Sequence, residues 1–159
     1  MSVRIEPATI ADVPIILELI RSLAEYEKLT HTVIATEDAL RQTLFGPRPC
    51  AEVLLALDGS EPLGFALFFP NYSTFLAKPG LYLEDVFVKP HARGRGIGLA
   101  LLKRLAAIAR DRGYGRMEWS VLDWHQPAIG FYKKLGAVLM DEWRICRITG
   151  DAIAMLADR

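Results

Sequence analysis

Residues 81–112 constrain the fold more than any other stretch, because a strand-like run meets an amphipathic helix there through a glycine-rich basic turn. Residues Leu81–Val88 are mostly apolar and predict a strand, which Pro90 ends because proline offers no backbone donor. Two arginines and three alternating glycines follow: Arg93, Gly94, Arg95, Gly96 and Gly98. Glycine lets a backbone approach a ligand closely, and a helix that begins at Ile97 directs free N–H groups and the positive end of its dipole toward an anion. The stretch therefore predicts a phosphate-binding turn.

The rest of the chain predicts further strands and helices around this unit. Strands are expected over residues 3–7, 51–57, 63–69, 116–121, 137–140 and 144–148. Helices are expected after the capping residues Thr9 and Thr36, from Ile97 to Gly113 and over residues 126–135, and a loop is expected over residues 71–80. The helix between strands 81–88 and 116–121 predicts a parallel crossover, and the earlier strands are of antiparallel type. This order predicts an α/β fold with a mixed, mostly antiparallel sheet flanked by helices.

Length, charge and apolar patterning exclude several classes of function. A chain of 159 residues fits a single domain, residues 1–159. Its 19 basic and 19 acidic residues balance, so no nucleic-acid-binding surface is expected. Charged residues interrupt the long apolar runs and the first residues lack a signal-peptide core, so we expect a cytoplasmic protein that does not bind membranes. His31, His91 and His125 lack metal-ligand spacing, so no metal is expected.

Two nucleotide-binding motifs are alternatives for the glycine-rich turn, and both fit it poorly. A P-loop requires a lysine and a hydroxyl residue after its last glycine, where this sequence has Leu99 and Ala100. A dinucleotide-binding turn follows the first strand of its fold, whereas this turn lies past the middle of the chain. A pyrophosphate held mainly by backbone amides remains as the expected ligand.

Two motifs, in this order along the chain, resemble the GNAT superfamily of N-acetyltransferases. Arg93-x-x-Gly96-x-Gly98 after a strand is similar to the acetyl-CoA pyrophosphate motif of that family, and residues 122–137 resemble its later motif. Shorter segments resemble the diamine (spermidine/spermine) and thialysine N-epsilon-acetyltransferases, over residues 4–9, 23–29, 82–85, 122–124 and 142–143. The resemblance implies a GNAT-like sheet with a central, splayed parallel strand pair. It also implies a cytosolic homodimer that transfers an acetyl group from acetyl-CoA to a small primary amine.

The same resemblance implies which residues hold acetyl-CoA. Phe87 and Val88 are expected to flank the pantetheine arm. The pyrophosphate is expected to lie against Arg93, Gly94, Arg95, Gly96, Ile97, Gly98 and Leu99. Tyr132 belongs to the cofactor-binding set, and Lys134 either reaches the adenosine phosphate or only solvent. His125 stands where relatives usually carry Asn, and it is a candidate for contact with the cofactor or a reacting proton.

Acetyl transfer to an amine requires a base for the ammonium group, stabilisation of an oxyanion and a proton for the leaving thiolate. Glu84 is the expected base, acting through water, and Tyr132 is the expected acid because a phenol is protonated at neutral pH. A regular strand directs Glu84 and Asp85 to opposite faces, but a β-bulge, common in the family near this position, brings both toward the site. The alternative is that both carboxylates only pair with neighbouring cations.

Substrates of the implied type carry a second positive charge, which Glu27, Glu84 and Asp85 together would attract. Tyr26 and Trp143 are expected to line the same pocket, or else to pack as ordinary core or interface aromatic residues. Two other functions stay open at this point. One is a non-catalytic acyl-CoA-binding regulatory module, and the other is an enzyme that acetylates an antibiotic, an amino acid or a protein amino terminus.

Overall fold

The structure is a computed structural model that describes residues 2–159 and divides into two compact units. The first unit extends to Ser120, and the second covers Val121–Arg159. The sheet and the helices α1, α2 and α3 belong to the first unit, and the helices α4 and α5 belong to the second. None of the helices in residues 2–159 is long and apolar enough to cross a membrane.

Within residues 2–120, the sheet has five strands in the order β1-β2-β3-β4-β5. Their bounds are Val3–Pro7 for β1, Glu52–Asp58 for β2, Glu61–Ser73 for β3, Lys78–Val88 for β4 and Met117–Trp119 for β5. Neighbouring strands are antiparallel except β4 and β5, which pair in parallel from Leu81↔Met117 to Leu83↔Trp119. This confirms the predicted mixed, mostly antiparallel sheet with one parallel pair, although β5 is shorter than predicted.

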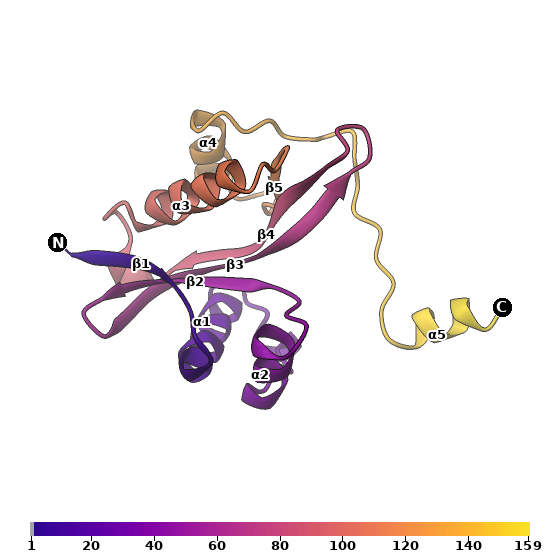
Figure 1. Ribbon diagram of the computed structural model, residues 1–159, viewed down its shortest axis with the longest axis horizontal. Helices are drawn as coiled ribbons and strands as arrows, with labels where there is room; N and C mark the ends of the chain where they lie inside the picture. Colours follow the sequence, from indigo (N-terminus) through magenta and orange to yellow (C-terminus); the bar gives the residue numbers. More distant parts are fainter. Residues whose placement is uncertain (1) are drawn as a thin grey trace. The chain divides into compact units, whose positions relative to one another are not determined.

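Helices cover both faces of this sheet (Figure 1). Helices α1 (Val13–Tyr26) and α2 (Glu37–Phe45) lie on one face, and α3 (Ile97–Asp111) lies on the other. Short 3-10 segments connect them to the strands: η1 (Ile10–Asp12), η2 (Thr30–Thr32) and η3 (Pro90–Ala92). The sheet is therefore the middle layer of a three-layer unit, and the end of β4 leads through η3 and the glycine-rich turn into α3.

Both predicted capping residues act at the starts of their helices. The backbone N–H of Thr9 donates to Asp12 Oδ2 over 2.8 Å, and Thr36 Oγ1 accepts the N–H of Ala39 over 3.1 Å. Each bond satisfies a polar group that the start of a helix leaves unpaired. The capping signals in the sequence are therefore confirmed.

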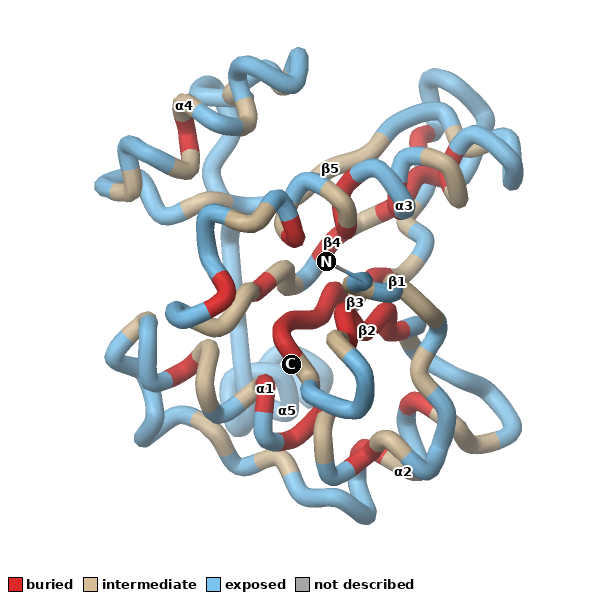
Figure 2. The backbone as a smooth tube through the Cα atoms, turned by 90° about the vertical axis from the view of Figure 1, so that its left-hand side faces the viewer, coloured by how far each residue is buried: buried red, intermediate tan, exposed pale blue. Residues whose placement is uncertain are grey.

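The core beneath α1 and α2 is built from alternate strand residues. Val53, Leu55 and Leu57 of β2 point into it together with Phe65 of β3 and Phe87 of β4. Helices α1 and α2 contribute the buried side chains of Val13, Ile16, Leu17, Leu19, Leu40 and Leu44. Burying one such side chain contributes about 1.5–3 kcal/mol, so this layer holds the helices on the sheet. Figure 2 shows the buried residues gathered in the strands and along α1, whereas α5 is exposed throughout.

The loop predicted over residues 71–80 is wrong, because most of it continues the hairpin of β3 and β4. Asn71, Tyr72 and Ser73 pair with Gly80, Pro79 and Lys78 in register. The turn itself is short, and Ser73 Oγ accepts the N–H of Leu76 within it over 3.2 Å. Polar and proline residues predict a loop when they are read locally, but backbone pairing with the opposite strand decides the structure here.

In the second unit, α4 covers Gln126–Lys134 and confirms the predicted helix. The strands predicted over residues 137–140 and 144–148 are wrong, because the chain has no strand there and ends with α5, Asp151–Ala157. A strand is stable only when a neighbouring strand satisfies its backbone groups, and residues 137–148 pair with no other strand of the described chain. Large apolar side chains of residues 137–159 are more than half exposed: Val138, Met140, Trp143, Ile145, Ile148, Ile153, Met155 and Leu156.

Candidate active site

The glycine-rich turn has the geometry that its sequence predicts. Strand β4 ends at Val88, η3 follows, and the chain reaches α3 through Gly94 and Gly96, both at φ +79°. This left-handed conformation strains residues that have a Cβ atom, so glycine is required at both positions. Gly96 is the residue that precedes α3, and its carbonyl accepts the N–H of Ala100 over 3.0 Å.

The start of α3 fits an anionic ligand. The first hydrogen bond within the helix is donated by Ala100, so the backbone N–H groups of Ile97, Gly98 and Leu99 have no acceptor within α3. The first turn contains no acidic side chain. The positive end of the helix dipole is therefore not neutralised by a carboxylate of its own helix. A Cβ atom on Gly94 or Gly96 would meet no heavy atom within 4 Å, so open space lies beside the turn. These features suit a pyrophosphate bound by backbone amides.

The two arginines of the turn contact protein groups. Arg93 Nε donates to the carbonyl of Val88 over 3.0 Å, and its guanidinium carbon lies 4.3 Å from the ring centre of Tyr26. Arg95 forms an ion pair with Asp58 over 3.1 Å. Both side chains therefore stabilise the turn, which favours backbone amides as the main phosphate contacts.

The other predicted cofactor residues of this unit differ in exposure. Phe87 and Ile97 are buried, with 4% and 2% of their surface exposed, so their side chains belong to the core. Val88 is half-buried and lies next to Gly98, where a Cβ atom would meet Val88 Cγ2 at 3.9 Å. Leu99 is exposed on the first turn of α3. Phe87 and Ile97 can contact a cofactor through their backbone rather than their side chains.

A β-bulge lies at the predicted catalytic carboxylates and confirms that expectation. Leu67 pairs with Asp85 and the next residue, Phe68, pairs with Leu83, so Glu84 is the extra residue of β4. Such a bulge breaks the alternation of side chains between the two faces of a sheet. Glu84 is exposed and Asp85 is half-buried.

The structure brings Glu27, Glu84 and Asp85 close enough to interact. Burial, together with the negative charges of Glu84 and Glu27, raises the pKa of Asp85 from 3.8 to about 6. Tyr26 is adjacent to Glu27 at the end of α1, and its ring lies 6.3 Å from that of Phe87. A concentration of negative charge at the end of α1 and the middle of β4 favours a cation.

The second unit carries the remaining predicted residues. His125 caps α4, because its Nδ1 accepts the N–H of Ala128 over 3.2 Å. Tyr132 lies on α4, and burial raises the pKa of its phenol, which therefore keeps its proton at neutral pH. Lys134 is in the last turn of α4 and is exposed. Trp143 is 75% exposed, so it is not a core residue of this chain.

Sequence reasoning missed the stacking of Arg93 on Tyr26 and the pairing of Arg95 with Asp58. Both contacts join residues that are far apart along the chain, and no local pattern predicts which residues the sheet brings together. Among residues 2–159, no group of three or more His, Cys, Asp or Glu side chains is arranged to hold a metal ion.

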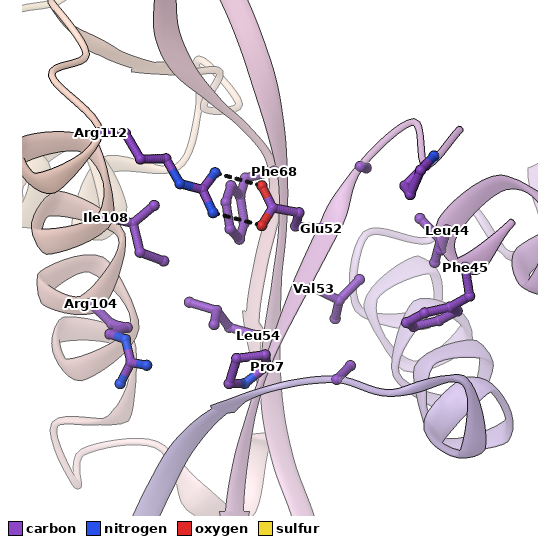
Figure 3. A pocket seen from close by; sticks show the side chains of 13 residues that line it. Pro7, Leu44, Phe45, Glu52, Val53, Leu54, Phe68, Arg104, Ile108 and Arg112 are labelled. Atoms are coloured by element: carbon purple, nitrogen blue, oxygen red, sulfur yellow. Dashed lines mark hydrogen bonds and ion pairs between the residues drawn. The ribbon is translucent and has the colours of Figure 1, made fainter. Parts of the chain in front are cut away.

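A cavity of about 350 Å³ lies elsewhere in the first unit and contains none of the predicted site residues. Leu44 and Phe45 of α2 and Arg104 and Ile108 of α3 line it from the two sides of β2 (Figure 3). At its edge Arg112 donates two hydrogen bonds to the Glu52 carboxylate, over 2.7 and 2.8 Å. This bond lowers the pKa of Glu52. The pair joins the end of α3 to β2 and is structural.

Comparison with known proteins decides the family. Residues 15–137 match the family described as "Acetyltransferase (GNAT) family". The chain belongs to the GNAT acetyltransferase family. Members transfer an acetyl group from acetyl-CoA, so this GNAT chain is an acetyl-CoA-dependent N-acetyltransferase. The matched residues include β4, the glycine-rich turn, α3 and α4.

Curated relatives and solved structures agree with this assignment of the GNAT chain. It is 40% identical to thialysine N-epsilon-acetyltransferase of Bos taurus, over 99% of this chain and 98% of that protein. It is 39% identical to an L-ornithine N5-acetyltransferase of Arabidopsis thaliana, over 94% of this chain and 86% of that protein. An integron cassette protein from the mobile metagenome of V. cholerae superimposes with a TM-score of 0.81 at 30% identity, over 100% of this chain and 99% of that one.

Proposed function

We propose that this GNAT enzyme acetylates a primary amine of a small substrate that carries a second positive charge, such as a diamine, a polyamine or a thialysine-like amino acid. The observation that carries the proposal is the grouping of Glu27, Glu84 and Asp85: the pKa of Asp85 is raised first by burial and further by the negative charges of Glu84 and Glu27. A bound cation stabilises three carboxylates that are held together. A substrate with two ammonium groups still carries one positive charge, which the carboxylates can bind, after the nitrogen that attacks the thioester has lost its proton.

The names of the relatives support this substrate class. Thialysine and ornithine, the substrates named for two proteins about 40% identical to this chain, are amino acids with a side-chain primary amine. Tyr26 and Trp143 complete the proposed pocket. The Arg93 guanidinium holds the Tyr26 ring from the side of the glycine-rich turn.

Acetyl-CoA, when bound, supplies the acetyl thioester that the amine attacks directly in a ternary complex. The backbone amides at the start of α3 hold its pyrophosphate, and Val88 flanks the pantetheine arm. Lys134 reaches the adenosine phosphate. These roles are consistent with the open space beside Gly94 and Gly96.

The proposed proton transfers use one residue from each unit. Glu84, acting through water, takes the proton that the ammonium must lose before its nitrogen bonds to the acetyl carbon. Tyr132 gives its phenolic proton to the thiolate that leaves when the carbon–sulfur bond breaks. Transfer therefore requires both units, and we propose that residues 1–159 act as one acetyltransferase domain. The match to the family, which crosses the boundary at Ser120, supports this.

We also propose that two copies associate through residues 137–159. This segment exposes eight large apolar side chains close together along the chain, and apolar groups gathered on a surface mark an interaction site. Its charges are self-complementary, since Asp141 and Glu142 precede Arg144 and Arg147. An antiparallel arrangement about a twofold axis would set the acidic pair of one copy against the basic pair of the other. The cytoplasmic location expected from the sequence stays a prediction.

A substrate panel tests the proposed function. Release of free CoA from acetyl-CoA is measured with a diamine, a dibasic amino acid, a monoamine, an aminoglycoside and a peptide amino terminus. We expect the dibasic small molecules to have the highest kcat/KM, and Glu27→Gln to raise KM for them by roughly tenfold while changing KM for the monoamine less. Glu25→Gln, an exposed change on α1, is the matched control.

Two results would overturn the proposal. Highest kcat/KM with the aminoglycoside or the peptide would assign another substrate class to the enzyme. An absence of thiol release with every amine would indicate an acyl-CoA-binding module without transfer.

A further inference from the structure

A histidine side chain caps the N-terminus of α4. His125 Nδ1 accepts the N–H of Ala128 over 3.2 Å, and the His125 carbonyl accepts the N–H of Ile129 over 3.1 Å. Tyr132 lies farther along the same helix. We propose that His125 is a positioning residue, which holds α4 so that the Tyr132 hydroxyl stays in place. The inference rests on the proposed role of Tyr132 as the acid.

Helix α4 is short, and this bond is the side-chain cap of its first turn, next to the buried side chain of Ile129. The helix has nine residues, and helices this short are marginally stable without tertiary or capping contacts. Its first turn has no acidic side chain to offset the helix dipole. The other end is closed through the backbone, since Ala137 N–H donates to the Tyr132 carbonyl over 3.1 Å and Gly136 has φ +98°. The side-chain cap at the start is therefore supplied by His125.

Neighbouring groups fix the orientation of the His125 ring. The indole of Trp124 stacks on the imidazole, with ring centres 5.4 Å apart and planes 18° apart. The N–H of His125 donates to the carbonyl of Leu122 over 3.0 Å. Asp123 is the ionisable residue of the preceding loop, and Lys133 and Lys134 lie in the last turn of α4. The ring is thus held with Nδ1 toward the helix.

The cap exists only while the imidazole is neutral. Nδ1 accepts a hydrogen bond only without a proton of its own, so Nε2 carries the hydrogen. Protonation of the ring turns Nδ1 into a donor and adds a positive charge at the positive end of the helix. Asparagine, one of the best capping residues, accepts the same bond and does not titrate. A histidine here therefore makes the hold on Tyr132 sensitive to pH, and an asparagine would remove that sensitivity.

The experiment combines NMR with kinetics on the full chain. In the wild type we expect the Ala128 amide shift to respond to protonation of the His125 ring, and the hydrogen-exchange protection factors of α4, which are corrected for the intrinsic pH dependence of exchange, to fall at least threefold when the ring is protonated. His125→Asn should abolish both effects, and near pH 8 its kcat should stay above that of His125→Ala because the amide oxygen restores the cap. His125→Ala should lower kcat roughly 3- to 30-fold, the range of a lost cap, with a smaller change in KM for acetyl-CoA. His31→Asn, an exposed histidine of η2, is the control and should change neither measurement.

The outcomes separate this inference from the proposed function. An Ala128 amide that does not respond to the His125 ring, or a His125→Ala variant with unchanged kcat, overturns the positioning role. So does a His125→Asn variant that is as slow as His125→Ala, because the cap is then not what His125 provides. Tyr132→Phe tests the acid role separately. If its turnover is unchanged while the Ala128 amide titrates, the proposed acid is wrong and the cap stands.

Discussion

Glycine is required for its backbone conformation at Gly96 but not at Gly98. Gly96 has a left-handed backbone, whereas Gly98 has ordinary helical geometry and a Cβ atom there would meet only Val88 Cγ2 at 3.9 Å. We predict that Gly96→Ala lowers the free energy of unfolding by about 1–2 kcal/mol and weakens CoA binding. Gly98→Ala keeps its backbone N–H, so it should raise stability by about 0.5–1 kcal/mol and leave the Kd for CoA within about twofold.

Denaturant unfolding and calorimetric titration with CoA measure these two effects, and Gly98→Ala is the matched control. Equal losses of affinity in both variants would show that space at the helix start, and not the left-handed backbone of Gly96, governs binding. Unchanged affinity in Gly96→Ala would argue against phosphate binding at this turn.

Asp85 makes the stability of the protein depend on pH. Because burial, with the charges of Glu84 and Glu27, raises its pKa from 3.8 to about 6, the folded state binds more protons than the unfolded state between these values. Stability from this group is therefore lost as pH rises from about 4 to 6. We predict that Asp85→Asn raises the free energy of unfolding near pH 7.5 by roughly 1–3 kcal/mol, and that the gain shrinks toward zero below about pH 4.

Urea unfolding across this pH range measures the gain, and Glu25→Gln, an exposed change on α1, controls for net charge. A gain of the same size at every pH would mean that titration of Asp85 is not its cause. A loss at pH 7.5 would mean that the carboxylate makes stabilising contacts when it is charged.

Elements whose signals are local could be predicted, and elements defined by distant pairing could not. Thr9 and Thr36 predict the starts of their helices because a cap acts within three residues. The strand, turn and helix over residues 81–112 could be predicted because they follow one another along the chain. Residues 71–80 were predicted as a loop because their pairing register is set across the hairpin. Residues 137–148 have strand-like residues but no partner strand in the described chain, so pattern alone was insufficient.

The same division holds for the site. The bulge at Glu84 was expected from the family resemblance, and the turn after Val88 was expected from its glycines, because both lie within one continuous stretch. Glu27 and Tyr26 reach this stretch only because α1 packs on the sheet through its apolar face. The contact of Arg93 with Tyr26 is therefore a product of core packing, and it links the proposed cofactor and substrate regions.

The exposed segment after α4 predicts that the protein is a dimer. Residues 137–159 leave eight large apolar side chains exposed, and burying such groups is the main favourable term in association. We predict that the protein sediments at twice 17.8 kDa at micromolar concentration. The double variant Ile145→Glu/Ile148→Glu should shift it to the monomer, because carboxylates at these positions resist burial and oppose the neighbouring Asp141 and Glu142.

A matched control separates this interface from a general effect of added charge. Ile34 is 90% exposed in the first unit, so Ile34→Glu places a glutamate outside the segment and should leave the dimer intact. Circular dichroism of each variant checks that the sheet and helices persist. A monomeric wild type would contradict the prediction, and so would a dimer that Ile34→Glu dissociates as readily as the double variant. If dissociation also lowers kcat/KM for dibasic amines while CoA binding is kept, the second copy contributes to the amine side of the site, the region to which Trp143 was assigned.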